Sequence, residues 1–286
     1  MTVTHGPVVI RRRLGHVLKQ LRVGRGKQLT DVAKLLEVSA SKLSRIETGH
    51  VEPKFRDVRD LLEIYDAAPE TRDQVLNWAN EAKSPGWWQP FSVRVTADLD
   101  LYISLESEAR AVLIYSTPIS GLLQTGQYAR DVLRGAIPDI TDDELTTLAD
   151  IRMGRQRVVA PDRSDEAPME LHAILDESAL HRSPGSAETM RAQLRELVER
   201  SHRSNVVLRI LPFSAGYTSA TSTFAIFEPR SDQDWPVVNV ESTGVDTYFD
   251  TPAEVHRYRA VWDDVAAKAL DPDESRQLIE DVLQRT

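Results

Sequence analysis

Residues 14–49, LGHVLKQLRVGRGKQLTDVAKLLEVSASKLSRIETG, predict three short amphipathic helices joined by two tight connections. Apolar residues recur at helical spacing in each segment, and the first run ends at Gly24, where the chain must turn. Ser39 is a suitable N-cap for the third helix, and Gly49 is a suitable end. The third helix is therefore expected to span about 40–48.

The exposed positions of this third helix carry small or hydrogen-bonding side chains. A capping box and the helix dipole would both favour an acid three residues after Ser39, yet that position holds Lys42. An anion outside the helix would compensate for this cation. Short polar side chains are also what a helix needs to enter a DNA major groove, which is about 12 Å wide, and to contact base edges.

The pattern resembles the XRE-type helix-turn-helix of phage-repressor-like proteins, in which the second and third helices form the DNA-reading unit. The resemblance implies that Ala40, Ser41 and Arg45 contact bases, while Lys42 and Ser44 contact the DNA backbone. The full set of predicted DNA-binding residues is Gln28, Ser39, Ala40, Ser41, Lys42, Ser44, Arg45 and Thr48.

The same resemblance implies a structural pair, Arg22 with Glu47, that braces the first helix against the third. Two positions depart from the family pattern. Glu37 occupies a turn position that is commonly glycine, and Leu29 stands where a glutamine often opens the second helix to hold a phosphate. The helix-turn-helix assignment survives both departures, which bear mainly on how phosphate is contacted.

The charge distribution favours DNA binding over the alternative, a three-helix packing module without nucleic acid. Residues 1–60 contain 13 Lys and Arg against 6 Asp and Glu, a balance of +7, whereas the remaining 226 residues have a balance of −16. Duplex binding by one end requires such a basic head, because phosphate neutralisation is local. Arg11–Arg13 are either a solvated charge run or contacts to phosphate or the minor groove.

Composition excludes several other classes of site and protein. The 286-residue chain has no cysteine, so disulfides, thiolate metal sites and cysteine nucleophiles are excluded. Neither a secretory signal nor an apolar run of 18 residues is present, so no membrane association is expected. We expect a cytoplasmic, nucleoid-associated protein.

The chain is expected to contain two domains and a connection. A five-helix, all-α head would span 1–83, a hinge 84–99, and a mixed α/β (α+β) domain 100–286. Trp87 and Trp88 in the hinge are either a ligand platform or, as adjacent indoles at a domain junction more often are, packing residues.

The expected C-terminal domain begins with a helix capped by Asp100 and running to about Tyr115. Capped helices follow at 125 and 141. After them, PMELHAILD, a helix and NVVLRILPF form a βαβ-like unit whose strands are expected to be parallel. Three further strands and two closing helices complete the prediction.

Blocks of this second domain resemble the C-terminal domain of toxin–antitoxin-like XRE regulators of antibiotic-producing soil bacteria. The blocks are YISLESEARAVLIYSTPISGLLQTGQYARDVL at 102–133, Arg155–Gln156, LDESALHR at 175–182, LRILPFSAG at 208–216 and ALDPDESRQLIEDVL at 269–283. The resemblance implies a transcription factor that works with a small partner protein encoded nearby, and it supplies no catalytic residues. We expect a homodimer on a near-palindromic operator in double-stranded DNA.

Two alternatives concern the body of the protein. It could sense a small molecule in a pocket between the sheet and the closing helices, lined by Phe213, Tyr217, Phe224 and Trp262. It could instead be an enzyme, which is disfavoured because no acid, base or nucleophile set stands out: the Ser39–Lys42 and GRGK patterns lack the companions of their catalytic or phosphate-binding counterparts. No cofactor is expected, and His172 near Asp176 and Glu177 is a weak metal candidate.

Overall fold

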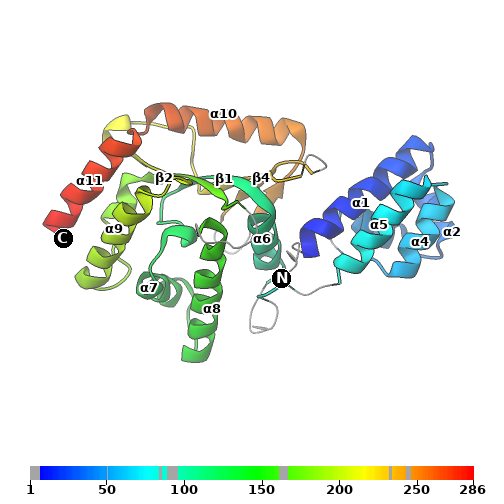
Figure 1. Cartoon of the computed structure of the whole chain (residues 1–286), viewed down its shortest axis with the longest axis horizontal. Coiled ribbons are helices and arrows are strands. Elements are labelled where there is room, and N and C mark those ends of the chain that lie inside the picture. Colours follow the sequence, from blue (N-terminus) through cyan, green and yellow to red (C-terminus); the bar gives the residue numbers. More distant parts are fainter. Residues whose placement is uncertain are drawn as a thin grey trace. The chain divides into compact units, whose positions relative to one another are not determined.

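The computed structural model describes residues 7–49, 51–83, 86–88, 96–160, 167–231, 234–242 and 246–286. The chain divides into two compact units, Met1–Glu108 and Ala109–Thr286 (Figure 1). The first is all helical and the second is built around a mixed sheet, so the predicted fold class, an all-α head followed by an α+β domain, is confirmed.

Six helices make up the described part of the first unit. They are α1 (Pro7–Gly24), α2 (Leu29–Leu35), α3 (Ala40–Glu47), α4 (Phe55–Ile64), α5 (Pro69–Glu81) and α6 (Ala97–Glu108). The apolar faces of α1 to α5 meet in one core, to which α1 gives Ile10, Leu14 and Leu18 and the other four helices give residues such as Leu43, Ile46, Leu61 and Val75. The amphipathic periodicity read from the sequence therefore selects the buried faces correctly.

The second unit contains a six-stranded sheet in the order β3-β2-β1-β4-β5-β6. Its strands are β1 (Ala109–Ser116), β2 (Glu170–Asp176), β3 (Val206–Leu211), β4 (Phe224–Pro229), β5 (Val237–Val240) and β6 (Thr247–Phe249). β1, β2 and β3 are parallel, as predicted for β2 and β3, while β4, β5 and β6 run antiparallel to their neighbours.

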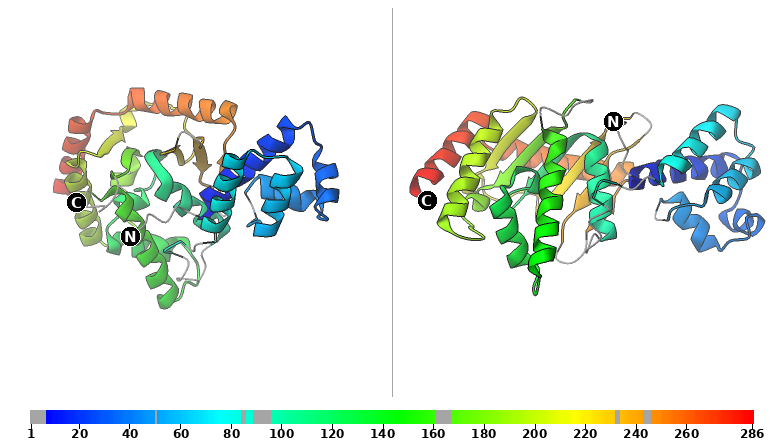
Figure 2. Two further views of the ribbon diagram at one scale, coloured as in Figure 1. Left: turned by 45° about the vertical axis from the view of Figure 1, so that its right-hand side comes forward. Right: turned by 60° about the horizontal axis from the view of Figure 1, so that its bottom comes forward.

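Helices cover both faces of this sheet (Figures 1 and 2). Helix α10 (Pro252–Lys268) lies across one face, where Phe224, Ile226 and Val238 meet Val255 and Val265 in a shared core. The other face carries α7 (Gly126–Ala136), α8 (Asp142–Arg155) and α9 (Ala187–Ser201). Helix α11 (Pro272–Arg285) packs on α9 and β3. The sheet is thus the middle layer of three.

One predicted element is wrong. The expected helix at about 100–115 is two elements, because α6 ends at Glu108 and the central strand β1 begins at Ala109. A central strand buried on both faces reads as a continuous apolar run, which periodicity alone does not distinguish from a buried helix. Asp100 is also not the N-cap: α6 begins at Ala97, and Thr96 Oγ1 accepts from the Leu99 amide at 3.2 Å.

Four helix starts of the second unit that the sequence predicts from cap residues are confirmed. Thr125 accepts from the Tyr128 amide, Thr141 and Asp271 form complete capping boxes, and Thr251 accepts from the Glu254 amide. These caps satisfy amides that would otherwise lack a partner in the first helical turn. Among the described residues, no helix is long and apolar enough to span a bilayer.

Candidate nucleic-acid interface

The turn between α2 and α3 is a Schellman motif. The Val38 amide donates to the Ala33 carbonyl at 2.9 Å, and the Glu37 amide donates to the Lys34 carbonyl at 3.2 Å. This geometry requires a left-handed residue after the helix cap, and Glu37 adopts it with φ of 56°. The departure from glycine noted in the sequence therefore leaves the turn intact, at the cost of backbone strain at Glu37.

Helix α3 begins as predicted. Ser39 Oγ accepts from the Lys42 amide at 3.1 Å, which identifies Ser39 as the N-cap. Gln28 occupies the corresponding N-cap position of α2, but its exposed side chain makes no cap hydrogen bond. The Ser39 side chain thus caps α3, whereas the exposed side-chain amide of Gln28 is available to an external ligand at the start of α2.

α1 and α3 approach each other closely at a glycine. A Cβ added at Gly15 would collide with the carbonyl oxygen of Ile46 and would lie 2.8 Å from that of Glu47. Any larger residue at Gly15 would have to push α1 away from α3. This position could not be predicted from the sequence, because a glycine inside a helical pattern gives no sign of what packs against it.

The predicted pair between Arg22 and Glu47 is present. Arg22 Nε donates to Glu47 Oε1 at 2.7 Å, and a second guanidinium nitrogen donates to Oε2 at 2.9 Å. The third nitrogen donates to the Lys27 carbonyl at 2.9 Å, so each of the three guanidinium nitrogens donates a hydrogen bond within the head. The Glu47 side chain is 3% exposed and that of Arg22 is 12% exposed. The hydrogen bond to Glu47 raises the pKa of Arg22, which keeps the guanidinium charged.

This brace joins the end of α1 to the end of α3 beneath the exposed surface of α3. Tyr65, buried after α4, lies near the same pair: its burial, and then the charge of Glu47, raise the pKa of its phenol. A fixed guanidinium and carboxylate therefore set the orientation of α3 relative to the rest of the head.

The exposed surface of α3 carries Ser41 and Arg45, with Thr48 following the helix. Ala40 and Ser44 are half-buried at the margin of this surface. Among the residues that the structure describes, the Arg45 guanidinium has no hydrogen-bond or ion-pair partner within the protein. Thr48 differs, since its hydroxyl donates to the Ser44 carbonyl at 2.9 Å. The side chain that the sequence predicts to read bases is thus presented to an external ligand.

Lys42 has a partner inside the head. Its ammonium lies 2.7 Å from Asp57 Oδ2, and Asp57 belongs to the first turn of α4. The anion that the sequence analysis required outside α3 is therefore supplied by the protein. Asp57 was missed because it lies 15 residues further along the chain, beyond the reach of helix-capping patterns. The Lys42 side chain is still 31% exposed, so its charge is only partly covered.

The arginine run at 11–13 is part of α1 and is half-buried. A guanidinium nitrogen of Arg11 lies 3.8 Å from Asp100 Oδ2, and the Arg13 guanidinium stacks over Trp78 at 5.4 Å. Of the two interpretations left open, a fully solvated charge run is wrong. Asp100 also accepts from Trp88 Nε1 at 2.7 Å, so this carboxylate ties α6 to two other segments of the first unit.

The two hinge tryptophans have different surroundings. Trp88 is 2% exposed, whereas Trp87 is partly exposed and packs edge-on against it. Most of the predicted hinge, residues 84–85 and 89–95, lies outside the described residues. Trp88 is therefore a packing residue, which favours the structural interpretation over a ligand platform for this indole.

The four aromatic residues proposed as a pocket lining in the second unit are not grouped together. Phe224 and Trp262 belong to the core between the sheet and α10. Phe213 and Tyr217, by contrast, are 62% and 85% exposed on the segment that follows β3. The predicted lining is therefore wrong as a set, because two of its members face the core and two face solvent.

The exposed pair lies on a well-anchored segment. Glu177 Oε2 accepts from the Phe213 amide at 2.6 Å, and Lys268 donates to the Tyr217 carbonyl at 3.0 Å. Hydrogen bonds from Lys268 and then Ser219 lower the pKa of Asp264 to about 2, which keeps this carboxylate charged. The aromatic side chains are thus held outward by a fixed backbone.

The metal candidate is not supported by the arrangement of its members. His172 Nε2 lies 3.8 Å from Glu170, while Asp176 accepts from the Ser178 amide at 2.9 Å and Glu177 binds the Phe213 amide. Within the described ranges, no group of three His, Asp or Glu side chains is placed to hold a metal ion.

Comparison with known proteins adds two family matches. The helix-turn-helix domain family matches residues 13–75, which contain α2, α3 and the turn between them. A domain of unknown function, DUF5753, matches residues 99–281, which span the sheet and its helices. No curated protein and no solved structure matches the chain. The two matches fall on the two parts of the chain that the sequence analysis separated.

Proposed function

Since this chain belongs to the DUF5753 family and carries a helix-turn-helix domain at its N-terminus, we propose that it acts as a sequence-specific transcriptional regulator of the XRE type. The observation that carries the proposal is the exposed surface of α3, on which Arg45 has no partner among the described residues while Arg22 and Glu47 fix the helix beneath it. An arginine presented in this way can donate two hydrogen bonds to guanine in the major groove.

Charge supports the same proposal. The balance of +7 in residues 1–60, against −16 in the rest, gives a chain with net charge −9 a basic end for the duplex. Non-specific attraction to phosphate brings the head to DNA, and base contacts from α3 then select the site. The proposal includes no catalytic step and no cofactor.

We further propose that two copies bind one operator. Two heads related by a two-fold axis would contact half-sites about 34 Å apart, so the operator would be near-palindromic. Selection from a random duplex library with the full-length protein tests both proposals. We expect enrichment of two inverted half-sites centred one helical turn apart. Enrichment of a single unrepeated element would contradict the dimer, and no enrichment would contradict sequence specificity.

The second unit is proposed to bind the small protein encoded nearby. Support comes from Phe213 and Tyr217, two large aromatic side chains that are 62% and 85% exposed on an anchored segment. Aromatic residues of this kind are typical anchors of protein interfaces.

Co-purification of the neighbouring protein with the wild type and with Phe213→Ser/Tyr217→Ser tests this interface. The wild type should retain the partner and the double variant should lose it. A double substitution of exposed residues on α9, Arg195→Ser/Glu199→Ser, is the control for unrelated surface changes. Equal retention by all three proteins would contradict the role of the aromatic pair.

A further inference from the structure

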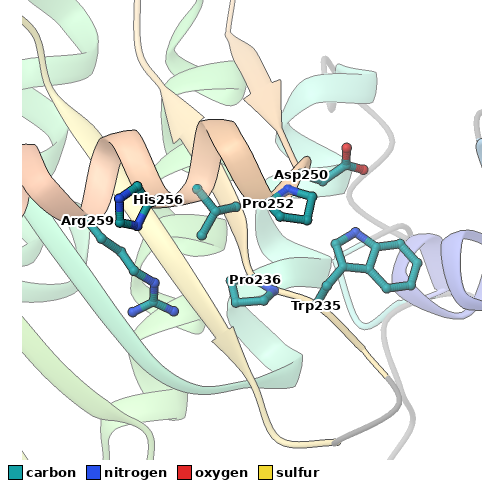
Figure 3. A pocket seen from close by; sticks show the side chains of 7 residues that line it. Trp235, Pro236, Asp250, Pro252, His256 and Arg259 are labelled. Carbon is teal, nitrogen blue, oxygen red and sulfur yellow. The ribbon is translucent and has the colours of Figure 1, made fainter.

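The second unit contains a cavity that the sequence analysis did not predict. It has a volume of about 290 Å³ and lies between the segment entering β5, the end of β6 and the first turns of α10 (Figure 3). The lining residues are Trp235, Pro236, Asp250, Pro252, Val255, His256 and Arg259. Ligand pockets of proteins begin at about 300 Å³, so the cavity suits a small molecule with one or two rings.

The walls of the cavity are mainly apolar. Pro236 and Pro252 contribute rings without a backbone N–H, and Val255 is a buried residue of the core beneath α10. Trp235 places its indole at one end (Figure 3). Proline rings and an indole are rigid, so they lose little conformational entropy when a flat ligand packs between them.

The opposite end of the cavity carries the basic groups. Arg259 and His256 lie there, one turn apart on α10, while Asp250 lies at the Trp235 end (Figure 3). One guanidinium nitrogen of Arg259 lies 2.6 Å from Glu228 Oε1 on β4, and the Glu228 side chain is only 12% exposed. The Arg259 side chain is 41% exposed, so N–H donors of its guanidinium are accessible to a ligand beside this ion pair.

From this arrangement we propose that the cavity is a binding site for a small aromatic carboxylate. The aromatic ring packs between the Trp235 indole and the Pro236, Pro252 and Val255 side chains. The carboxylate points to the other end, where it accepts hydrogen bonds from Arg259 and His256. The positions of Arg259 and His256 determine the direction of binding, because they place hydrogen-bond donors at the end of the cavity away from Asp250.

Binding at this place has a consequence for the fold. The ligand would add contacts between the segment entering β5 and α10, which both line the cavity. It would therefore stabilise the second unit by mass action. The site goes beyond the proposed DNA-binding function and is tested without DNA, so failure of one leaves the other standing.

The test uses ¹⁹F NMR of the full-length chain labelled with 5-fluorotryptophan. The chain has five tryptophans, and the Trp235→Phe variant assigns the resonance of Trp235. Titration uses 1-naphthoate and its uncharged analogue 1-naphthalenemethanol as probes. We expect 1-naphthoate to shift the Trp235 resonance saturably and to leave the Trp78 and Trp262 resonances in place.

Arginine variants of α10 test the binding of the carboxylate by Arg259 separately from the packing of the aromatic ring. Arg259→Met should weaken 1-naphthoate binding at least about tenfold and change 1-naphthalenemethanol binding little, because only the acid uses the guanidinium. Arg257→Met is the matched control: Arg257 lies over the Tyr258 ring and does not line the cavity, so both probes should bind as to the wild type. Arg259→Lys keeps the charge beside Glu228 in case the methionine variant fails to fold, and it should give an intermediate loss.

Three outcomes would overturn the proposal. The first is no shift of the Trp235 resonance at probe concentrations up to about 5 mM, the range of weak binding. The second is an equal shift of all tryptophan resonances, which would indicate non-specific association. The third is equal weakening of 1-naphthoate by Arg257→Met and Arg259→Met, which would assign the effect to overall charge.

Discussion

Glu37 has a backbone conformation that is unfavourable for a residue with a Cβ. Its φ of 56° lies in the left-handed region, which costs a residue with a Cβ about 1–2 kcal/mol. The turn between α2 and α3 needs this conformation for both of its closing hydrogen bonds. The head therefore tolerates strain at the centre of its DNA-binding motif.

Replacing Glu37 should reveal this strain. Glu37→Gly is expected to stabilise the head by about 0.5–1 kcal/mol, whereas the β-branched Glu37→Val should destabilise it by at least about 1 kcal/mol. Urea unfolding followed by ¹⁹F NMR of Trp78, which is buried in the head core, measures the difference. Identical midpoints for glycine and valine would show that the turn is not strained.

Arg22 and Glu47 form a buried ion pair, which stabilises the head only when both partners are present. Arg22→Met leaves the Glu47 carboxylate buried without its guanidinium, so the head should lose about 3–5 kcal/mol of unfolding free energy. The double variant Arg22→Met/Glu47→Leu should recover much of this loss, because it removes the uncompensated charge. Chemical denaturation measures each variant, and a loss below about 1 kcal/mol in the single variant would contradict the brace.

Tyr128 on α7 makes the second unit sensitive to alkali. Burial raises the pKa of Tyr128 to about 12, compared with about 10 in an unfolded chain. The unfolded chain therefore loses its phenolic proton first, and stability that is present below pH 10 is lost as the pH rises toward 12. The expected loss from this group is about 1.4 kcal/mol per pH unit in that window.

Thermal unfolding of wild type and Tyr128→Phe between pH 9 and pH 11.5 tests this expectation. Tyr115 has its pKa raised in the same direction, again mainly by burial, so the wild type should lose stability through both groups. The phenylalanine variant should show a shallower decline than the wild type. Parallel declines would show that Tyr128 ionises as freely in the folded protein as in the unfolded one.

At the scale of elements, some side chains of α3 stabilise the fold and others are exposed to a ligand. Leu43, Ile46 and Glu47 are buried, Ser39 caps the helix, and Ser41 and Arg45 are exposed. Lys42 stands between the two groups, since Asp57 of α4 holds its ammonium. A residue that already has an internal partner contributes less to selecting a base than one without.

This division predicts different effects of two substitutions on DNA binding. Arg45→Ala should cost about 1–3 kcal/mol at the specific site and relax discrimination at the base it contacts. Lys42→Ala should weaken binding to all sequences about equally, by a smaller amount because Asp57 already neutralises part of its charge. Titrations on the operator and on single-base variants measure both, and equal loss of specificity from the two would contradict the division.

Strand β1 shows where sequence reasoning about elements fails. Leu101, Leu105, Ala109 and Val112 recur at helical spacing, so the sequence predicts one helix, yet Ala109 begins the central strand. Pairing with β2 on one side and β4 on the other decides the conformation, and neither partner is near in sequence. Strands β2 to β6 were predictable because turn residues and a change of period bound them.

At the scale of the whole chain, the two units differ in how much of their chemistry could be predicted. The helix-turn-helix is local, so the cap at Ser39 could be read from its residues. The turn at Glu37 and the pair of Arg22 with Glu47 followed from the resemblance of 36 consecutive residues to the XRE-type pattern. The cavity of the second unit depends on side chains from a loop, a strand end and α10. Their proximity follows from the packing of the sheet edge on α10, which no local pattern encodes.

The opposite charges of the head and the body determine how salt should affect the proposed DNA binding. A basic head attracts duplex DNA through the phosphates, so rising salt should weaken specific and non-specific binding alike. Phosphate contacts weaken steeply as salt rises for every sequence. Base contacts from α3 should preserve the ratio between specific and non-specific affinity.

The most direct measurement is fluorescence anisotropy of the full-length protein on duplex from its own upstream region and on a scrambled duplex, at two salt concentrations. The account predicts tighter binding to the native duplex, with a preference that persists at the higher salt and falls in Arg45→Ala. Equal affinity for the two duplexes at both salt concentrations would contradict sequence-specific recognition by α3. If neither duplex binds, the titration is repeated with the neighbouring small protein added, and continued absence of binding contradicts the proposed regulator.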